Sequence, residues 1–258
     1  MPPISPMLSL LSLQPSRPDA AAPGWLPQGE WNAAQTSLEA DASRGDHLAM
    51  AALARLAVAR GRFADAARDL QKATAEPALS GIARAWVLLS SAWLGLEDAR
   101  PLQALEDLKA VAEHLPNGDA LWPRLDALMA EAFLRVGAQH EASAAASRAL
   151  ARAAQGGELT ASCRARRVLA EVSATAGDGD KARQEFRAAV DDAERAQNPY
   201  ELGQSLLSLG VFLGRRGAGD SARQALSLAR TWFSAIGAEA KLREVDLYLE
   251  RVHGTTTR

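Results

Sequence analysis

Cysteine is almost absent from this sequence, because Cys163 is the one cysteine among 258 residues. A lone thiol forms no internal disulfide and supplies no cysteine-rich metal site. Since a chain without disulfides fits a reducing compartment, we expect a cytoplasmic protein. Histidine is scarce too: the four histidines are scattered, and none forms the i, i+4 pair typical of helical metal sites. We therefore predict no metal, no cofactor, no catalytic residue and no enzyme activity.

The chain also lacks a strong charge of either sign and a long apolar run. Its net charge is −2 and its isoelectric point is near 6.1, so no positive field favours nucleic acid or an anionic membrane. No segment approaches the ~18 apolar residues that a membrane span needs. Residues 7–13 and Ala22 have features of an export signal, but a basic start is missing and prolines interrupt the segment.

Aromatic residues are few, at 5% of the chain, whereas hydrophobic residues reach 48% and are mainly alanine and leucine. Alanine and leucine favour helices, while strands prefer branched and aromatic side chains. The composition therefore predicts an all-α protein.

One spacing recurs along the chain: a glycine followed by alanine at +5, a large apolar residue or alanine at +9, and a small residue at +12. Gly61, Ala66, Leu70 and Ala73 form the first copy. The copy at Ala99 has alanine in place of the glycine. The alanines at +5 are Ala66, Ala104, Ala142, Ala182 and Ala222, so the period is 38 to 40 residues. Each unit therefore reads as a helix, a tight turn at the glycine and a second helix.

This pattern resembles the tetratricopeptide repeat family, in which small residues recur in a helix-turn-helix unit of about 34 residues. The resemblance covers about residues 27–237, and the longer period is similar to the regulatory arms of bacterial transcription activators. It implies a right-handed α-α superhelix of about five repeats. We expect residues 27–44 to form a half-repeat and residues 238–252 a capping helix. Residues 1–26, rich in proline and serine, are expected to be flexible, residues 27–252 to form the solenoid, and residues 253–258 to fray.

In such a superhelix the first helix of each unit lines a concave groove, so the repeat register predicts which side chains meet a partner. The predicted binding residues are Arg55, Trp86, Leu89, Trp93, Arg124, Glu131, Arg135, Arg164, Arg167, Glu171, Gln204 and Arg215. No asparagine occupies an inner position, so we do not expect the carboxylate clamp of chaperone-binding members of the family.

Trp86 and Trp93 lie seven residues apart on one helix face, where tryptophans commonly become binding hot spots. An equally weighted alternative is that both rings pack against the first repeat. Arginines outnumber glutamates among the predicted binding residues, which indicates either a basic patch or a solvated helix face.

A short acidic motif, Asp178-Gly179-Asp180, lacks the further ligands of a calcium loop. We interpret it as a turn between helices with Asp180 as the N-cap.

We therefore predict a non-catalytic adaptor or sensor module of bacterial type that binds a protein or peptide segment of acidic character. Two alternatives remain open. The first is a self-associating assembly scaffold, a homo-oligomer that docks through residues 8–13. The second is an exported envelope assembly factor cleaved near Ala22.

Overall fold

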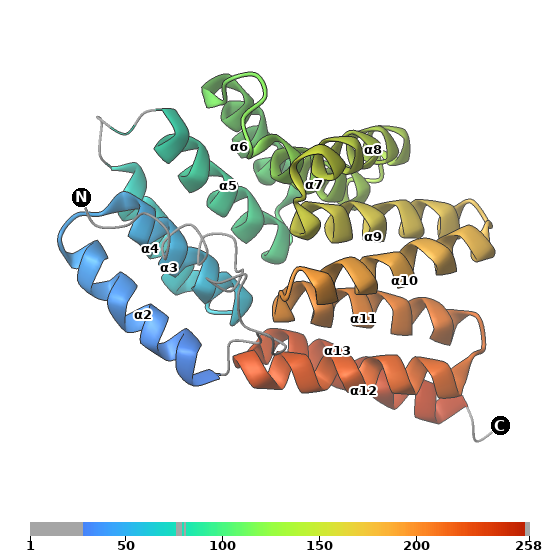
Figure 1. Cartoon of the computed structure of the whole chain (residues 1–258). Helices are drawn as coiled ribbons and strands as arrows, with labels where there is room; N and C mark the ends of the chain where they lie inside the picture. The colour runs from blue at the N-terminus through green and yellow to red at the C-terminus, as the bar shows by residue number, and fades with distance from the viewer. Residues whose placement is uncertain (1–27, 76–78, 80, 256–258) are drawn as a thin grey trace.

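The computed structural model describes residues 28–75, 79 and 81–255, and among these residues it contains helices and no strand (Figure 1). A single N-terminal helix, α2 (Gln28–Ser43), precedes five helix-turn-helix pairs. The pairs are α3 (His47–Ala59) with α4 (Phe63–Thr74), α5 (Gly81–Glu97) with α6 (Pro101–His114), α7 (Trp122–Arg135) with α8 (Gln139–Gly156), α9 (Leu159–Thr175) with α10 (Gly179–Arg195), and α11 (Pro199–Arg215) with α12 (Gly219–Ile236). A last helix, α13 (Glu239–Thr255), covers the final pair.

The spacing seen in the sequence defines these pairs. The recurring alanines are fully buried where the two helices of a pair meet: Ala66, Ala104, Ala142, Ala182 and Ala222 each have an exposed fraction of 0%. The turn position has a left-handed backbone in every copy, for example φ 76° at Gly61 and φ 54° at Ala99. Glycine adopts this conformation without strain, so the sequence places the turns where the backbone requires them.

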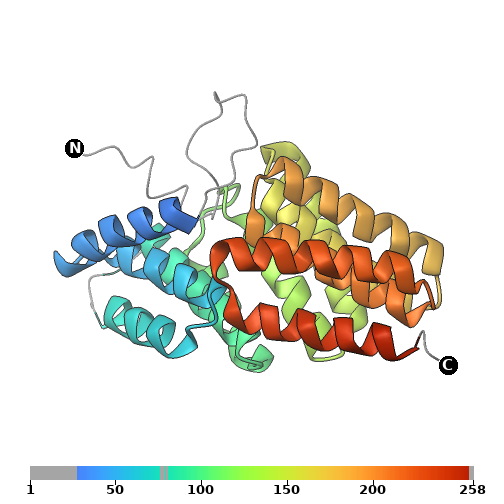
Figure 2. The ribbon, with the colours of Figure 1, turned by 90° about the horizontal axis from the view of Figure 1, so that it is seen from below.

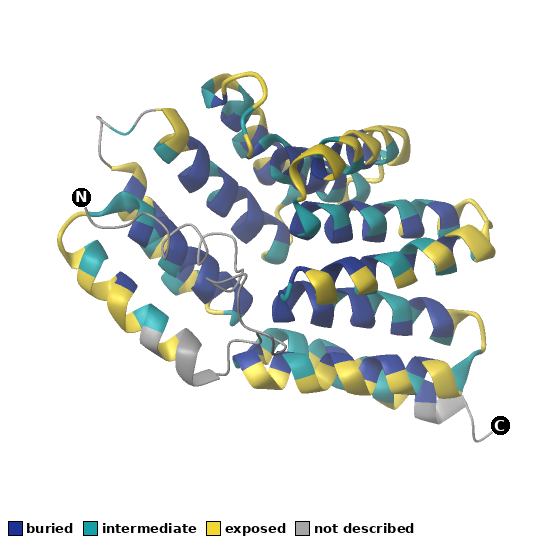
Figure 3. Cartoon of the chain, in the orientation of Figure 1, coloured by how far each residue is buried: buried dark blue, intermediate teal, exposed yellow. Residues whose placement is uncertain are grey.

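The two helices of a pair have different surroundings. Figure 3 shows dark, buried faces along α3, α5 and α11 and broad exposed faces along α10 and α12. In α4 only Ala66, Leu70 and Ala73 are buried, one stripe at helical spacing, whereas α3 buries residues around most of its circumference. The first helix of each pair therefore forms the inner layer, and the second forms the outer layer.

The ends of the chain broadly follow the expected arrangement. The half-repeat expected at residues 27–44 is α2, and the expected capping helix is α13, which continues to Thr255 instead of ending at residue 252. The N-cap of α10 is Asp178, whose carboxylate accepts a hydrogen bond from the Lys181 amide at 3.1 Å. The expectation of Asp180 as the cap was therefore wrong, because the helix begins at Gly179, two residues before the start that an Asp180 cap would give.

The inner wall is closed over part of its length, because the first and last repeats touch. Figures 1 and 2 show the end of α12 and the start of α13 beside α2 and α3. The Arg60 side chain donates a hydrogen bond from Nε to the carbonyl of Ile236 at 3.3 Å. The Lys241 ammonium lies 3.0 Å from the Glu97 carboxylate. The superhelix thus curves far enough for its two ends to meet.

Two findings bear on the remaining expectations. No helix in the described ranges is both long and apolar enough to cross a membrane. The expectations for residues 1–26, including docking through residues 8–13 and cleavage near Ala22, fall outside the described residues, as do residues 256–258.

Candidate functional site: a charged groove on the inner wall

The inner helices bring the predicted binding residues together in two groups. One group lies on α3, α5 and α7, and it consists of Arg55, Trp86, Leu89, Trp93 and Arg124. The other group borders an open groove, and it consists of Glu131, Arg135, Arg164, Arg167, Glu171, Gln204 and Arg215. The register read from the sequence therefore selects residues of one wall, and the wall has two parts with different properties.

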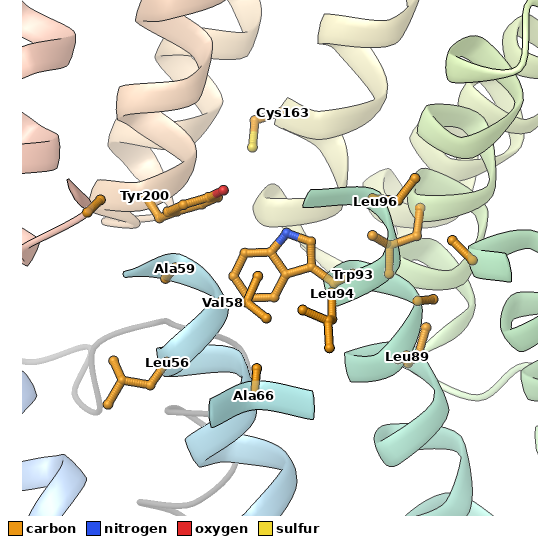
Figure 4. Packing of buried hydrophobic residues seen from close by; sticks show 14 of the residues in the cluster. Leu56, Val58, Ala59, Ala66, Leu89, Trp93, Leu94, Leu96, Cys163 and Tyr200 are labelled. Atoms are coloured by element: carbon orange, nitrogen blue, oxygen red, sulfur yellow. The ribbon is translucent and has the colours of Figure 1, made fainter. Parts of the chain in front are cut away.

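Both predicted tryptophan anchors are buried. The exposed fraction is 5% for Trp86 and 1% for Trp93. The guanidinium carbon of Arg55, from the first repeat, lies 5.9 Å from the ring centroid of Trp86 and 4.9 Å from that of Trp93. Figure 4 shows the Trp93 ring enclosed between Val58 and Tyr200. This arrangement matches the alternative in which the rings pack within the protein, and it leaves no open aromatic face for a partner.

The open part of the wall is a groove of about 630 Å³, which we call the charged groove. It is lined mainly by α7, α9, α11 and α13, with Glu97 of α5 and Gly179 and Phe186 of α10 at its borders. Its polar lining includes Glu131, Arg135, Arg164, Arg167, Glu171, Gln204, Arg215, Arg216, Lys241 and Glu244. Its apolar lining includes Leu207, Phe212, Val211 and Tyr248. The groove is large enough to receive several side chains of a bound segment.

A network of ion pairs holds one wall of the groove in place. Arg164 lies between two carboxylates: its guanidinium is 3.2 Å from Glu131 and in closer contact with Glu201. Arg167 contacts the same Glu201 carboxylate at 2.7 Å. The exposed fraction of Glu201 is 2%, so these bonds form in a weakly screened environment. The network fixes the arginine side chains before any partner arrives.

The pKa values of the groove glutamates Glu131 and Glu171 shift in opposite directions. Burial would raise the pKa of Glu131, but attraction from Arg135, Arg164 and Arg167 outweighs it and lowers that pKa to about 2. Loss of hydration between the groove walls raises the pKa of Glu171, and the nearby Glu131 adds to the effect. Water still reaches the Glu171 side chain, which is exposed. Glu131 is therefore committed to internal ion pairs, whereas Glu171 gains from a cationic or hydrogen-bonding partner.

The sequence analysis missed several residues of this wall. Glu201 lies one turn before Gln204 on α11, so extending the same register by one turn would have found it. Glu97, Lys241 and Tyr248 come from the end of α5 and from α13, and they join the groove because the superhelix closes. No local sequence signal indicates that contact, since the partners are far apart in the chain.

Two observations bear on the chemistry that the described residues could perform. No group of three or more histidine, cysteine, aspartate or glutamate side chains among them is arranged to hold a metal ion. Burial raises the pKa of the Cys163 thiol well above its usual range, and the Glu201 carboxylate adds to this shift. A thiol in this environment stays protonated and unreactive.

Comparisons with known proteins identify the fold. No family model matches the chain, and neither does any curated protein. Among solved structures, RapI in its apo form has a TM-score of 0.51 at 10% identity, covering 89% of this chain and 70% of RapI. Aspartyl phosphate phosphatase F from Bacillus subtilis has a TM-score of 0.56 at 15% identity, covering 87% of this chain and 63% of that protein.

A third similar structure is a signal transduction ATPase with numerous domains and a tetratricopeptide repeat sensor, from Pyrococcus horikoshii. It has a TM-score of 0.55 at 16% identity, and the match covers 86% of this chain but 34% of that protein. This chain thus spans about a third of that ATPase and just under two thirds of the phosphatase. The chain has a tetratricopeptide-like helical repeat fold, as the spacing of small residues predicted.

Proposed function

We propose that this protein is a non-catalytic adaptor or sensor module that binds a protein or peptide segment in the charged groove. The observation that supports the proposal is the groove itself, a space of about 630 Å³ lined mainly by α7, α9, α11 and α13. Seven of the predicted binding residues line it, from Glu131 on α7 to Arg215 on α11.

The chemistry of the groove favours a partner with acidic and apolar side chains. Six basic residues and four acidic residues line the groove, so the wall has a positive excess although the whole chain has a net charge of −2. Arg215 is exposed and has no ion-pair partner among the described residues. An acidic side chain of a bound segment gains the most by pairing with Arg215, since the buried arginines already have carboxylate partners.

Apolar groove residues replace the tryptophans as the anchoring surface. Leu207 and Phe212 form part of the floor, with exposed fractions of 4% and 6%. Val211 and Tyr248 are half-buried beside them. An apolar side chain of the partner would cover this floor, while the charged rim selects its neighbours.

The similar structures support a regulatory role by their printed names. One of them contains a tetratricopeptide repeat sensor, which is a precedent for sensing by this fold. Another is named a phosphatase, but the described part of this chain presents no group of three or more histidine, cysteine, aspartate or glutamate side chains arranged to hold a metal ion. A binding role therefore agrees better with the groove than a catalytic one.

A random-peptide display selection against the purified protein tests this proposal. We expect enrichment of peptides that combine an acidic residue with an apolar residue, and loss of their binding by tenfold or more in Arg215→Glu. Arg187→Glu is the matched control, because Arg187 is an exposed arginine on the outer helix α10 and lies outside the groove. Equal binding by the two variants would contradict the proposal.

A further inference from the structure

A second, much smaller cavity lies where the inner ends of α3, α5, α7, α9 and α11 converge. Its volume is about 30 Å³, and its polar lining comprises Arg55, Trp93, Arg124, Thr160, Arg164, Asn198 and Glu201. Since one water needs roughly 10–15 Å³ of such space, the cavity has room for about two waters or one small ion. It is separate from the charged groove, although Arg164 borders both.

Unsatisfied hydrogen-bond donors gather around this cavity. Six buried side-chain nitrogen or oxygen atoms in the described residues have no protein partner, and four of them belong to its lining. The four are Arg55 Nε, Trp93 Nε1, Arg124 Nη1 and Asn198 Nδ2. Each carries a hydrogen and none is an acceptor. Leaving a buried donor without a partner costs about 1–3 kcal/mol, so four at one place call for a shared acceptor.

The orientation of the Asn198 side-chain amide is fixed because this residue is also a helix N-cap. Asn198 is fully buried and is the N-cap of α11, where its Oδ1 accepts a hydrogen bond from the Glu201 amide at 3.1 Å. Because the oxygen serves the cap, the amide nitrogen is the end left for the cavity. Figure 4 shows the Trp93 indole nitrogen on the side of its ring that faces Cys163 on α9. Two neutral donors from different repeats thus lie at one small space.

The lining is also positively charged. It contains three arginines and one glutamate, and Glu201 is already paired with Arg164 and Arg167. Arg124 is held by Glu158 through two hydrogen bonds of 3.2 and 3.1 Å. Arg55 has no carboxylate partner among the described residues and contacts the faces of Trp86 and Trp93 instead. A buried guanidinium without a counter-ion is unfavourable, so the cavity attracts negative charge.

The pKa of Arg55 agrees with this charge distribution. Burial, together with repulsion from Arg124 and Arg164, lowers the pKa of Arg55 to about 9. The surroundings therefore destabilise the charged form of the Arg55 guanidinium, and a nearby anion would stabilise it.

We propose that this cavity is a binding site for one small monovalent anion, of the size of chloride or bromide, which accepts hydrogen bonds from Arg55, Trp93, Arg124 and Asn198. A spherical anion accepts several N–H groups at once. A water molecule accepts about two and must place its own two hydrogens, and apart from Glu201 and Thr160 the polar side chains of the lining offer donors to the cavity. The anion would join residues of α3, α5, α7 and α11, which belong to both halves of the solenoid. This inference is independent of the partner proposed for the charged groove.

Thermal unfolding in salts of different anions tests the inference. Sodium bromide is titrated against sodium gluconate at constant ionic strength, because gluconate is a monovalent anion too large for the cavity. We expect a saturable rise of about 3 °C or more in the unfolding midpoint with bromide and none with gluconate. A midpoint that depends on ionic strength alone would overturn the inference.

Two variants place the effect at the cavity. Asn198→Asp keeps the capping oxygen, replaces the Nδ2 donor and supplies its own negative charge, so the bromide dependence should disappear. Trp93→Phe keeps an aromatic ring but removes the indole donor, and we expect bromide affinity to fall about tenfold. Arg187→Gln on the outer surface should respond like the wild type. Unchanged bromide affinity in the two cavity variants would mean that the anion binds elsewhere and would refute the site.

Crystals grown in sodium bromide give the direct observation. An anomalous peak within hydrogen-bond distance of Trp93 Nε1 and Asn198 Nδ2 is the expected result. A cavity that contains only water under these conditions contradicts the inference.

Discussion

Trp93 on α5 and Tyr200 on α11 pack edge to face, with ring centroids 5.2 Å apart and an angle of 80° between the ring planes. Each side chain has an exposed fraction of 1%. The two helices belong to different halves of the solenoid, so this contact joins repeats that are not neighbours in the chain. Tyr200 also lies 6.1 Å from the Phe233 ring, which extends the aromatic cluster into the outer layer.

Truncating either ring should destabilise the protein strongly. We expect Trp93→Ala and Tyr200→Ala each to lower the free energy of unfolding by about 3–5 kcal/mol, because each removes a large buried side chain. The double variant should show a coupling of about 0.5–1.5 kcal/mol, measured by urea unfolding of all four proteins. Trp122→Ala should show no coupling to Tyr200, because the half-buried Trp122 indole contacts the Pro116 carbonyl and the Arg152 guanidinium instead. Strict additivity of the Trp93 and Tyr200 effects would contradict the contact.

Gly61 should tolerate alanine less well than an equivalent turn glycine. Gly61 and Gly217 have nearly equal backbone angles, φ 76° and 77°, so alanine brings similar backbone strain at both. A Cβ at position 61 would also lie 2.7 Å from the Cβ of Ala240, whereas one at position 217 meets nothing within 4 Å. We expect Gly61→Ala to cost about 1–3 kcal/mol more than Gly217→Ala in chemical unfolding. Equal losses would show that α3 and α13 do not touch in solution.

The repeats could be predicted from the sequence because their determinants are local. Ala66 and its equivalents mark the close contact within each pair, and the glycines mark the left-handed turns. Even the copy without glycine keeps the turn, since Ala99 adopts φ 54°. The small residues and the turn residues act within one repeat, so a single sequence contains the information needed to find the repeats.

The closure of the solenoid could not be predicted in this way. It depends on the rotation between successive repeats, and small differences add up over five units. The total rotation over the five repeats decides whether Trp93 faces solvent or packs against Tyr200. No residue near Trp93 in the sequence determines that total. The sequence therefore predicted residues of the inner wall, but not that closure of the solenoid buries Trp86 and Trp93.

The stability of the protein should depend on the charge of Glu131 in acid. Its pKa falls from 4.5 to about 2 in the folded protein, so its ion pairs stabilise the fold fully above pH 4.5 and are lost as the pH falls toward 2. We expect Glu131→Gln to lower the free energy of unfolding near neutral pH by an amount on the order of 3 kcal/mol. The difference between the two proteins should shrink between pH 5 and about pH 2 in urea unfolding. A constant difference across this range would argue against the assigned pairs.

The thiol of Cys163 should report on opening of the inner layer. Its exposed fraction is 0% and its raised pKa keeps it protonated, so a thiol reagent should label the folded protein at pH 8 far more slowly than the unfolded chain. Labelling should become faster in Trp93→Ala, where the surroundings are loosened. Rapid labelling of the folded wild type would show that α9 is not packed as described.

The ion pair between Glu97 and Lys241 fastens the second repeat to the terminal helix at 3.0 Å. In an open solenoid each repeat contacts only its neighbours, so the array bends easily and can unfold from either end. Because this ion pair joins the two ends, each repeat is restrained by contacts from both directions along the chain. The walls of the charged groove are then held at a fixed separation. A partner segment must therefore fit between them before its charges can pair with the groove.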